Sequence, residues 1–216
     1  MVISRRGDVK LRQTVRETWA LNILESVVFP IAENFCPIHP KYRKNWYTCK
    51  LHPNLKNLKP DSNDFKQFMS NQEQTDNFDK ETRLQSAIFD EQNVLKIPGI
   101  VDTYHNLTQK QLISFKLISE KFPKMRWLIK LDIDMLANPS RISGYLKKYK
   151  DPEHRVFGKV VKNVPARKPK TPEWDVLDYT KSTNFPTYAM GGFMIISFNV
   201  VTYFAQNFEK LHPYII

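Results

Sequence analysis

The spacing of apolar residues along the chain predicts alternating helices and strands. Apolar residues that recur every three or four positions predict helices over residues 10–21, 108–122, 141–149 and 200–211. Short apolar runs between polar residues predict strands over residues 1–4, 93–101, 127–131, 156–161 and 192–198. Such alternation is typical of an α/β domain, so we expect a mainly parallel central sheet flanked by helices.

Two of these helices carry more detailed expectations. In the first, Leu11, Val15 and Trp19 share one face at helical spacing and are expected to face the core. The second is expected to begin with a capping box, in which Thr108 is the N-cap and Gln111 stands three residues later.

The segment from about residue 34 to residue 83 shows no sustained period and contains four prolines. We expect it to be an irregular surface insertion, because loops of this length are uncommon in compact domains unless they serve a function. The whole chain, residues 1–216, is expected to be a single domain. Residues 1–4 resemble the tail of a strand, so we expect the chain to be truncated at its start.

Composition narrows the class of protein. Hydrophobic residues make up 41% of the chain, enough for a sizeable core, which argues against disorder throughout. The formal net charge of +11 favours an anionic partner, but it does not choose among nucleic acid, a membrane face, a polyanionic glycan and a phosphorylated small molecule. No apolar run approaches the length that crosses a bilayer.

Two carboxylates, Asp132 and Asp134, stand where the strand over residues 127–131 ends. Ligands of open α/β sheets bind at the carboxyl ends of strands. A hard divalent cation held by one or two carboxylates can neutralise a diphosphate there. An Asp-x-Asp pair is common enough by chance that, by itself, it favours a solvated loop over a metal site.

Five sequence segments, which follow one another along the chain, favour the metal site over the solvated loop. The first reads Arg-x-x-Val-Arg-x-Thr-Trp, the second Asp-x-Tyr-x-Asn-Leu-Thr-x-Lys, and the third Lys-x-Asp-Ile-Asp. They occupy residues 12–19, 102–110, 130–134, 165–167 with Trp174, and 185–193. Together they resemble the galactosyltransferase-type β-1,3-glycosyltransferases. The motif of that family reads Lys-x-Asp-Asp-Asp, and Ile133 replaces its middle Asp. The resemblance runs from about residue 3 to residue 197 and leaves residues 34–83 largely unmatched.

The resemblance implies a GT-A fold and an inverting reaction. A hexose or N-acetylhexosamine would pass from a UDP-sugar to a glycan hydroxyl and form a β-1,3 bond. It also implies a type II membrane protein of the Golgi, with a lumenal catalytic domain and an anchor and stem missing from this sequence. No nucleic acid partner is expected. The general base would come from an acidic motif beyond Ile216, so no residue of this chain is assigned to it and the chain is expected to be inactive by itself.

The resemblance also implies roles for particular residues. Manganese is expected on Asp132 and Asp134, and donor nucleotide near Arg12, Arg16 and Lys130. The two arginines lie one helical turn apart, a spacing that suits either a phosphate or a buried carboxylate. The remaining expected substrate contacts are Tyr188, Gly191 and Gly192, although Tyr188 equally suits simple packing and the glycines equally suit a turn.

Cys36 and Cys49 allow two interpretations. With His39 and His52 they form two Cys-x-x-His pairs, a possible zinc set among basic and aromatic residues, as in a nucleic-acid-binding module. The lumenal location that the resemblance implies favours a Cys36–Cys49 disulfide instead. Asn106 begins an Asn-Leu-Thr glycosylation sequon, although it also suits a turn.

One further alternative keeps the fold and loses the activity. A chain without a catalytic base is also compatible with an inactive nucleotide-binding pseudoenzyme of the same fold.

Overall fold

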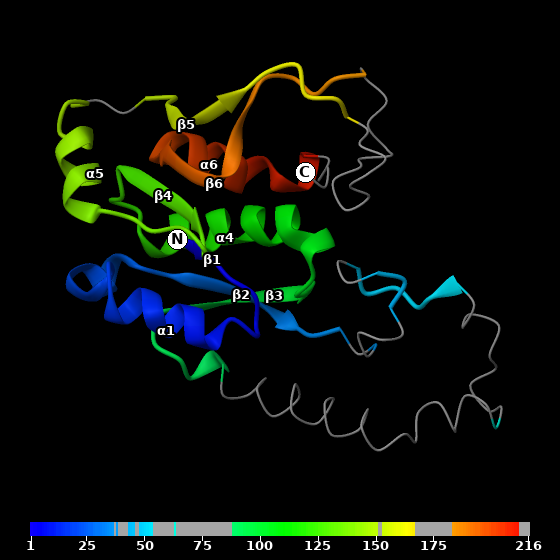
Figure 1. Cartoon of the computed structure of the whole chain (residues 1–216). Coiled ribbons are helices and arrows are strands. Elements are labelled where there is room, and N and C mark those ends of the chain that lie inside the picture. Colours follow the sequence, from blue (N-terminus) through cyan, green and yellow to red (C-terminus); the bar gives the residue numbers. More distant parts are fainter. Residues whose placement is uncertain are drawn as a thin grey trace.

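The computed structural model describes residues 1–36, 38, 43–45, 48–53, 63, 88–150, 153–166 and 183–211. Its four-stranded sheet has the order β1 (Val2–Ile3), β4 (Trp127–Asp132), β6 (Tyr188–Ser197), β5 (Val156–Val161). A second sheet pairs β2 (Phe29–Asn34) with β3 (Val94–Val101). The backbone N–H of Val2 donates to the carbonyl of Val28 at 2.9 Å, so β1 joins the two sheets (Figure 1).

The sheet directions differ from the sequence prediction. The pairs β1–β4 and β2–β3 are parallel, but β6 runs antiparallel to both β4 and β5. The four-stranded sheet is therefore mixed and not mainly parallel. Apolar runs identify strands but carry no information on strand direction, which depends on how each connection returns to the sheet.

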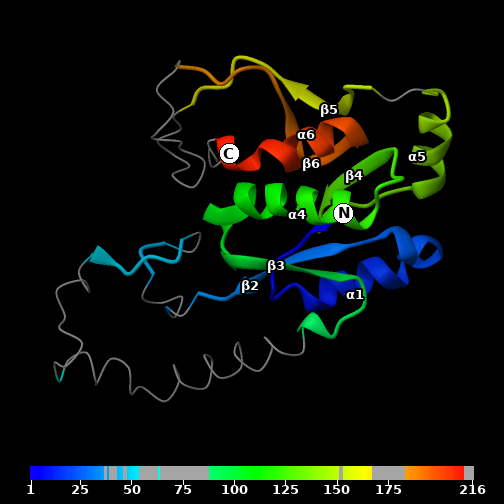
Figure 2. The same cartoon turned by 180° about the vertical axis from the view of Figure 1, so that it is seen from behind.

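Helices cover both faces of the strands. The helices are α1 (Val9–Glu17), α4 (Leu107–Lys121), α5 (Pro139–Leu146) and α6 (Phe198–Asn207), with short 3-10 turns η1 (Leu21–Ser26), η4 (Tyr104–Asn106) and η6 (Phe208–Lys210). In both views α1 and α4 lie on opposite sides of β2 and β3, and α6 lies beside α4 (Figures 1 and 2).

Two buried clusters follow from the alternation of side chains along the strands. Met1 and Ile3 point to a cluster that includes Phe115 of α4 and Val201 of α6. Val2 lies between them in sequence and points to the opposite cluster. That second cluster contains Val15 of α1, Phe29, Leu131 and Ala137, with Trp19 packed against it.

Most predicted elements are present, although β2 was not predicted and the helices predicted over 141–149 and 200–211 end earlier, at Leu146 and Asn207. Other departures concern particular residues. The helix predicted over residues 10–21 ends at Glu17, and Leu11 is exposed although it was predicted to face the core. The capping box is wrong, because α4 begins at Leu107 directly after η4 and Thr108 lies inside its first turn. The last strand begins at Tyr188, four residues earlier than predicted.

Most of the insertion predicted over residues 34–83 lies outside the described residues. In the part of the chain that the structure describes, no helix combines the length and the apolar character needed to cross a membrane.

Candidate functional site

The acidic pair lies at the edge of the sheet, as the sequence predicts. Asp132 is the last residue of β4, and Asp134 lies in the turn that follows, which the N–H of Met135 closes by donating to the carbonyl of Asp132 at 3.0 Å. β4 is held in place by Leu128 and Leu131, which are buried in the two clusters on opposite sides of the sheet. The side chain of Asp132 is 39% exposed and Asp134 is exposed, so a ligand can reach both carboxylates.

Lys130 holds this edge together from inside. Its side chain is only 3% exposed, and its ammonium group donates to Asp132 Oδ1 at 2.5 Å and to the carbonyl of Gly191. Lys130 therefore ties the end of β4 to β6 and orients the carboxylate of Asp132. Among the described residues, Asp132 Oδ2 makes no hydrogen bond that would occupy it.

The two glycines of β6 lie against the same carboxylate. The register pairs Phe193 with Leu131, which places Gly191 and Gly192 beside the end of β4. A Cβ on Gly192 would lie 2.7 Å from Met135 Cε and 3.8 Å from Asp132 Oδ2. A side chain at residue 192 would therefore require the end of the flexible Met135 side chain to move.

The donor set fits a hard divalent cation. Carboxylate oxygens are the ligands that such ions take, and magnesium-like ions complete their shell with phosphate oxygens and water. Asp132 and Asp134 supply two carboxylates. Across the described residues, no three His, Cys, Asp or Glu side chains gather closely enough to hold an ion by themselves. An ion at this edge would therefore depend on oxygens from its substrate.

Tyr188 lies three residues before Gly191 at the start of β6. Its ring packs edge to face on Phe185, with ring centroids 6.3 Å apart, in a small cluster with Val164 and Ala166. Tyr188 therefore packs against its neighbours, which is one of the two roles that the sequence suggests for it. A contact between Tyr188 and a glycan acceptor stays a prediction.

Arg12 and Arg16 converge on a residue that the sequence did not single out, Glu91. Arg12 is fully buried and forms a two-pronged ion pair with Glu91, at 2.7 Å and 2.9 Å. Arg16 reaches the same carboxylate at 3.1 Å, and its guanidinium lies 4.8 Å from the centre of the Phe29 ring. Of the two partners that the arginine spacing suits, the structure provides the buried carboxylate. Their contact with a nucleotide stays a prediction.

The electrostatics of Glu91 follow from this arrangement. Partial burial acts to raise the pKa of Glu91, but the hydrogen bonds and positive charges of Arg12 and Arg16 outweigh it, so the pKa is lowered. Glu91 precedes β3 in a polar turn, and no periodicity or motif in the sequence marks it.

A second buried ion pair joins the two ends of the motif over residues 102–110. Lys110 Nζ lies 2.7 Å from Asp102 Oδ1, and the two side chains are 3% and 4% exposed. Burial lowers the pKa of Lys110 more than the neighbouring carboxylate of Asp102 raises it. The sequence placed both residues in a family motif without giving either a role.

The cysteines are joined in the structure. Cys36 and Cys49 form a disulfide. Because a bridged sulfur is not a thiolate, this state provides no cysteine ligands for the alternative zinc set. His39 of that set lies outside the described residues.

Asn106 ends the short turn η4, and its Nδ2 donates to the carbonyl of Val101 at 2.9 Å. A glycan would replace one of the two hydrogens on that nitrogen, and the other could still donate to Val101. Glycosylation of Asn106 stays a prediction.

Part of the fourth motif segment lies outside the described residues. This part comprises Arg167 and Trp174, and the neighbouring acidic residues Asp175 and Asp178 lie outside as well.

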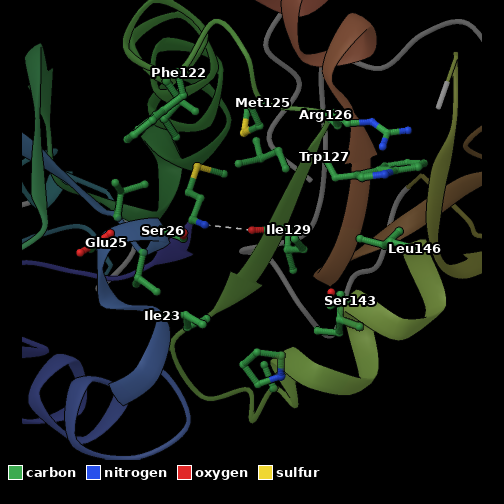
Figure 3. Close-up of a pocket in the computed structure, with 18 of the residues that line it drawn as sticks. Ile23, Glu25, Ser26, Phe122, Met125, Arg126, Trp127, Ile129, Ser143 and Leu146 are labelled. Carbon is green, nitrogen blue, oxygen red and sulfur yellow. Dashed lines mark hydrogen bonds between the residues drawn. The ribbon is translucent and has the colours of Figure 1, made fainter. Parts of the chain in front are cut away.

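A cavity of about 800 Å³ opens elsewhere, between the first half of β4, α5 and η1. Its walls are mostly apolar, with Phe122 and Met125 on one side and Leu146 on the other (Figure 3). None of the predicted site residues lines it. The candidate site is thus the open edge at Asp132 and not this cavity.

Comparison with known proteins identifies the family of the chain. The sequence model of the galactosyltransferase family matches residues 75–216, more than half of the chain, which includes Lys130, Asp132, Gly191 and Gly192. The proteins named β-1,3-galactosyltransferase 1 of mouse and of human are each 28% identical to the chain over 106 residues. That alignment covers 48% of the chain and 32% of each relative, so the chain matches about a third of their length. The chain belongs to the galactosyltransferase family.

Proposed function

We propose that the protein transfers a hexose or an N-acetylhexosamine from a UDP-sugar to a hydroxyl group of a glycan, forming a β-1,3 linkage with inversion. Membership of the galactosyltransferase family supports glycosyl transfer in general. The name β-1,3-galactosyltransferase 1 of the relatives supports the linkage.

One structural observation carries the proposal. Asp132, Asp134, Lys130 and the two glycines of β6 come from two strands and a turn, and they meet at one exposed edge of the sheet. An open edge with two carboxylates, a buried lysine that orients one of them and a close backbone approach suits a metal-bound diphosphate.

The reaction is a single displacement. The acceptor oxygen bonds to the anomeric carbon of the donor while the bond from that carbon to the diphosphate breaks, which inverts the centre. The hydroxyl proton passes to a general base, to which none of the described residues is assigned. When bound, manganese would neutralise the charge that develops on the leaving diphosphate. The chain's own share is to hold the donor: Asp132 and Asp134 bind the ion, and Lys130 fixes the orientation of Asp132.

The proposal includes a location. Disulfides persist in oxidising compartments, and Cys36 and Cys49 are bridged. The Golgi lumen, which the sequence resemblance implies, is such a compartment.

Replacement of the exposed carboxylate tests the proposal. Asp134→Asn should weaken manganese-dependent binding of uridine diphosphate by more than about 100-fold, because removal of even an outer-shell partner of a metal costs 10- to 100-fold. Isothermal titration calorimetry with and without manganese measures this. The fold should survive, because Asp134 lies in an exposed turn.

Asp90→Asn is the matched control, since Asp90 is also exposed, follows no sheet strand and should leave binding unchanged. Equal binding by the wild type and Asp134→Asn would refute the metal role. Manganese-dependent binding without transfer from any of a panel of UDP-sugars, in a chain extended beyond residue 216, would favour the inactive nucleotide-binding alternative.

A further inference from the structure

The loop between β1 and α1, residues 4–8, leaves the sheet next to the candidate site. β1 is parallel to β4, and its last residue, Ile3, stands opposite Asp132 in the register. Ser4 is therefore the first residue beyond the edge on the strand neighbouring Asp132. The same pairing places residues 4–8, which we call the β1–α1 loop, beside the exposed acidic edge.

Lys110 and Asp102 bind the backbone of this loop. Lys110 Nζ donates to the carbonyl of Ser4 at 2.7 Å, and Asp102 Oδ2 accepts from the backbone N–H of Arg6 at 2.7 Å. The other oxygen of Asp102 accepts from Lys110 at 2.7 Å. The ion pair thus fastens the loop at two points, which lie two residues apart.

Arg12 fastens the same loop from the other side. Its guanidinium donates to Ser4 Oγ at 2.8 Å and to the carbonyls of Arg5 and Arg6 at 2.6 Å and 3.2 Å. The buried Arg12–Glu91 pair holds that guanidinium in turn. Three side chains from α1, α4 and the residue after β3 therefore bind the first three residues of the loop, Ser4, Arg5 and Arg6.

One side chain of the loop is left facing solvent. The side chain of Arg5 is 73% exposed, and its ion pair with Asp8 is long, at 3.4 Å. Arg6, by contrast, turns inward and donates to the carbonyls of Ala32 and Glu33 at 2.7 Å and 2.8 Å. Arg5 follows two residues after Ile3, the register partner of Asp132, so its exposed guanidinium leaves the sheet at the same end as the acidic pair. A guanidinium is the side-chain group that binds phosphate oxygens in pairs.

Burial of an ion pair is weak evidence for stability, because desolvation offsets much of the attraction. A buried pair whose remaining bonds all go to one loop is better explained by the single conformation it imposes. We propose that Lys110 and Asp102 are positioning residues, which hold the β1–α1 loop so that Arg5 meets the diphosphate of the bound nucleotide. This inference rests on the proposed function, because it requires a nucleoside diphosphate at the Asp132 edge.

The test removes the pair without leaving a buried charge. The double variant Asp102→Asn/Lys110→Met keeps an acceptor for the N–H of Arg6 and loses both the ion pair and the bond to Ser4. Without the pair, the loop should adopt the conformation that presents Arg5 only part of the time. If that fraction is about one tenth, the apparent Kd for uridine diphosphate with manganese rises about tenfold. Calorimetry measures the Kd, and hydrogen exchange of a peptide containing residues 4–8 should become faster.

Coupling to Arg5 distinguishes positioning from a general structural role. Arg5→Gln should weaken binding several-fold in the wild type and much less in the double variant, because the loop no longer presents Arg5. Val201→Ala is the stability control: Val201 is fully buried in α6 and lies in the cluster around α4 and α6. This variant should lose stability and keep its Kd.

Each outcome is informative. An unchanged Kd in the double variant, or an equal effect of Arg5→Gln in both backgrounds, overturns the positioning role while wild-type binding leaves the proposed function in place. A Kd that rises equally in Val201→Ala overturns it too, since general destabilisation would then explain the loss. Absence of manganese-dependent binding in the wild type overturns the proposed function itself, and this inference with it.

Discussion

Arg12, Arg16 and Lys130 are all cations of the family motifs, and each is buried in an ion pair with a neighbouring carboxylate. A motif read from sequence suggests that such residues touch the substrate. In this structure the carboxylates that they pair with are Glu91 and Asp132, and each cation also donates to a backbone carbonyl, so their first effect is to shape the site. Of the charged residues in the Lys-x-Asp-Ile-Asp motif, Asp132 and Asp134 are the ones that solvent reaches.

Loss of Glu91 should destabilise the protein strongly. Glu91→Gln leaves the fully buried Arg12 without its charged partner, and breaking such a pair costs about 3–5 kcal/mol. Because Glu91 is 17% exposed and glutamine keeps one acceptor, we expect the lower end of that range. Urea unfolding at pH 7 measures the change. Glu120→Gln, on the exposed face of α4, should change little.

The same variant has a predicted pH dependence. The pKa of Glu91 is lowered in the folded state, so its stabilisation is present above the unfolded pKa of about 4.3 and is lost as the pH falls through the folded pKa. The difference between wild type and Glu91→Gln should therefore shrink from pH 7 to pH 3. A constant difference would show that the carboxylate charge is not what stabilises Arg12.

At the scale of elements, the site depends on how β6 meets the turn after β4. β6 runs antiparallel to β4, which brings Gly191 and Gly192 back to the end where Asp132 emerges. A parallel β6 would run in the same direction as β4, and its early residues would lie at the start of β4. Strand direction, which the sequence prediction had wrong, is therefore what assembles the site.

Gly192→Ala tests this close approach. The added Cβ would lie 2.7 Å from Met135 Cε, so the Met135 side chain must move within the turn that carries Asp134. We expect manganese-dependent binding of uridine diphosphate to weaken by about tenfold, since small misplacements near reacting groups are costly. Calorimetry should find much of the affinity restored in Gly192→Ala/Met135→Ala.

Gly144→Ala provides the comparison. A Cβ on Gly144 in α5 meets nothing within 4 Å, so this variant should bind normally and gain about 0.5–1 kcal/mol of stability. Normal binding by Gly192→Ala as well would mean that the turn after β4 does not need this approach.

At the scale of the whole molecule, two buried clusters hold the strand that ends at Asp132. Helices α4 and α6 pack on one cluster, which includes Leu128 of β4, and α1 packs on the other, which includes Leu131 of β4. The disulfide lies apart from both clusters, in the segment that follows β2. It closes a loop between residues separated by 13 positions. Its contribution therefore acts on the connection between β2 and β3 and not on the site.

Removal of the disulfide should cost stability without loss of nucleotide binding. Closing a loop of this size typically contributes about 3 kcal/mol by restricting the unfolded chain. Cys36→Ser/Cys49→Ser should lower the free energy of unfolding by up to that amount in urea denaturation, with an unchanged Kd for uridine diphosphate. Two thiols that react freely in unfolded, unreduced wild-type protein would contradict the bridge.

Local signals in the sequence determined the positions of several strands, the place of the acidic pair and the family. The apolar runs placed β3, β4 and β5 to within a residue, and the position of Asp132 and Asp134 after β4 followed from the same runs. Five ordered motifs indicated the family. These features depend on residues close together in the chain, where periodicity and spacing report directly on structure.

Contacts between distant positions were decided only by the tertiary structure. Arg12 meets Glu91 at a separation of 79 residues, Lys110 meets Ser4 at 106, and Lys130 meets Gly191 at 61. No local pattern specifies such partners, because they depend on which elements pack together and in which direction the strands run. For the same reason the sequence could name Arg12, Arg16 and Lys130 but could not say that burial against carboxylates, and not exposure to solvent, governs their chemistry.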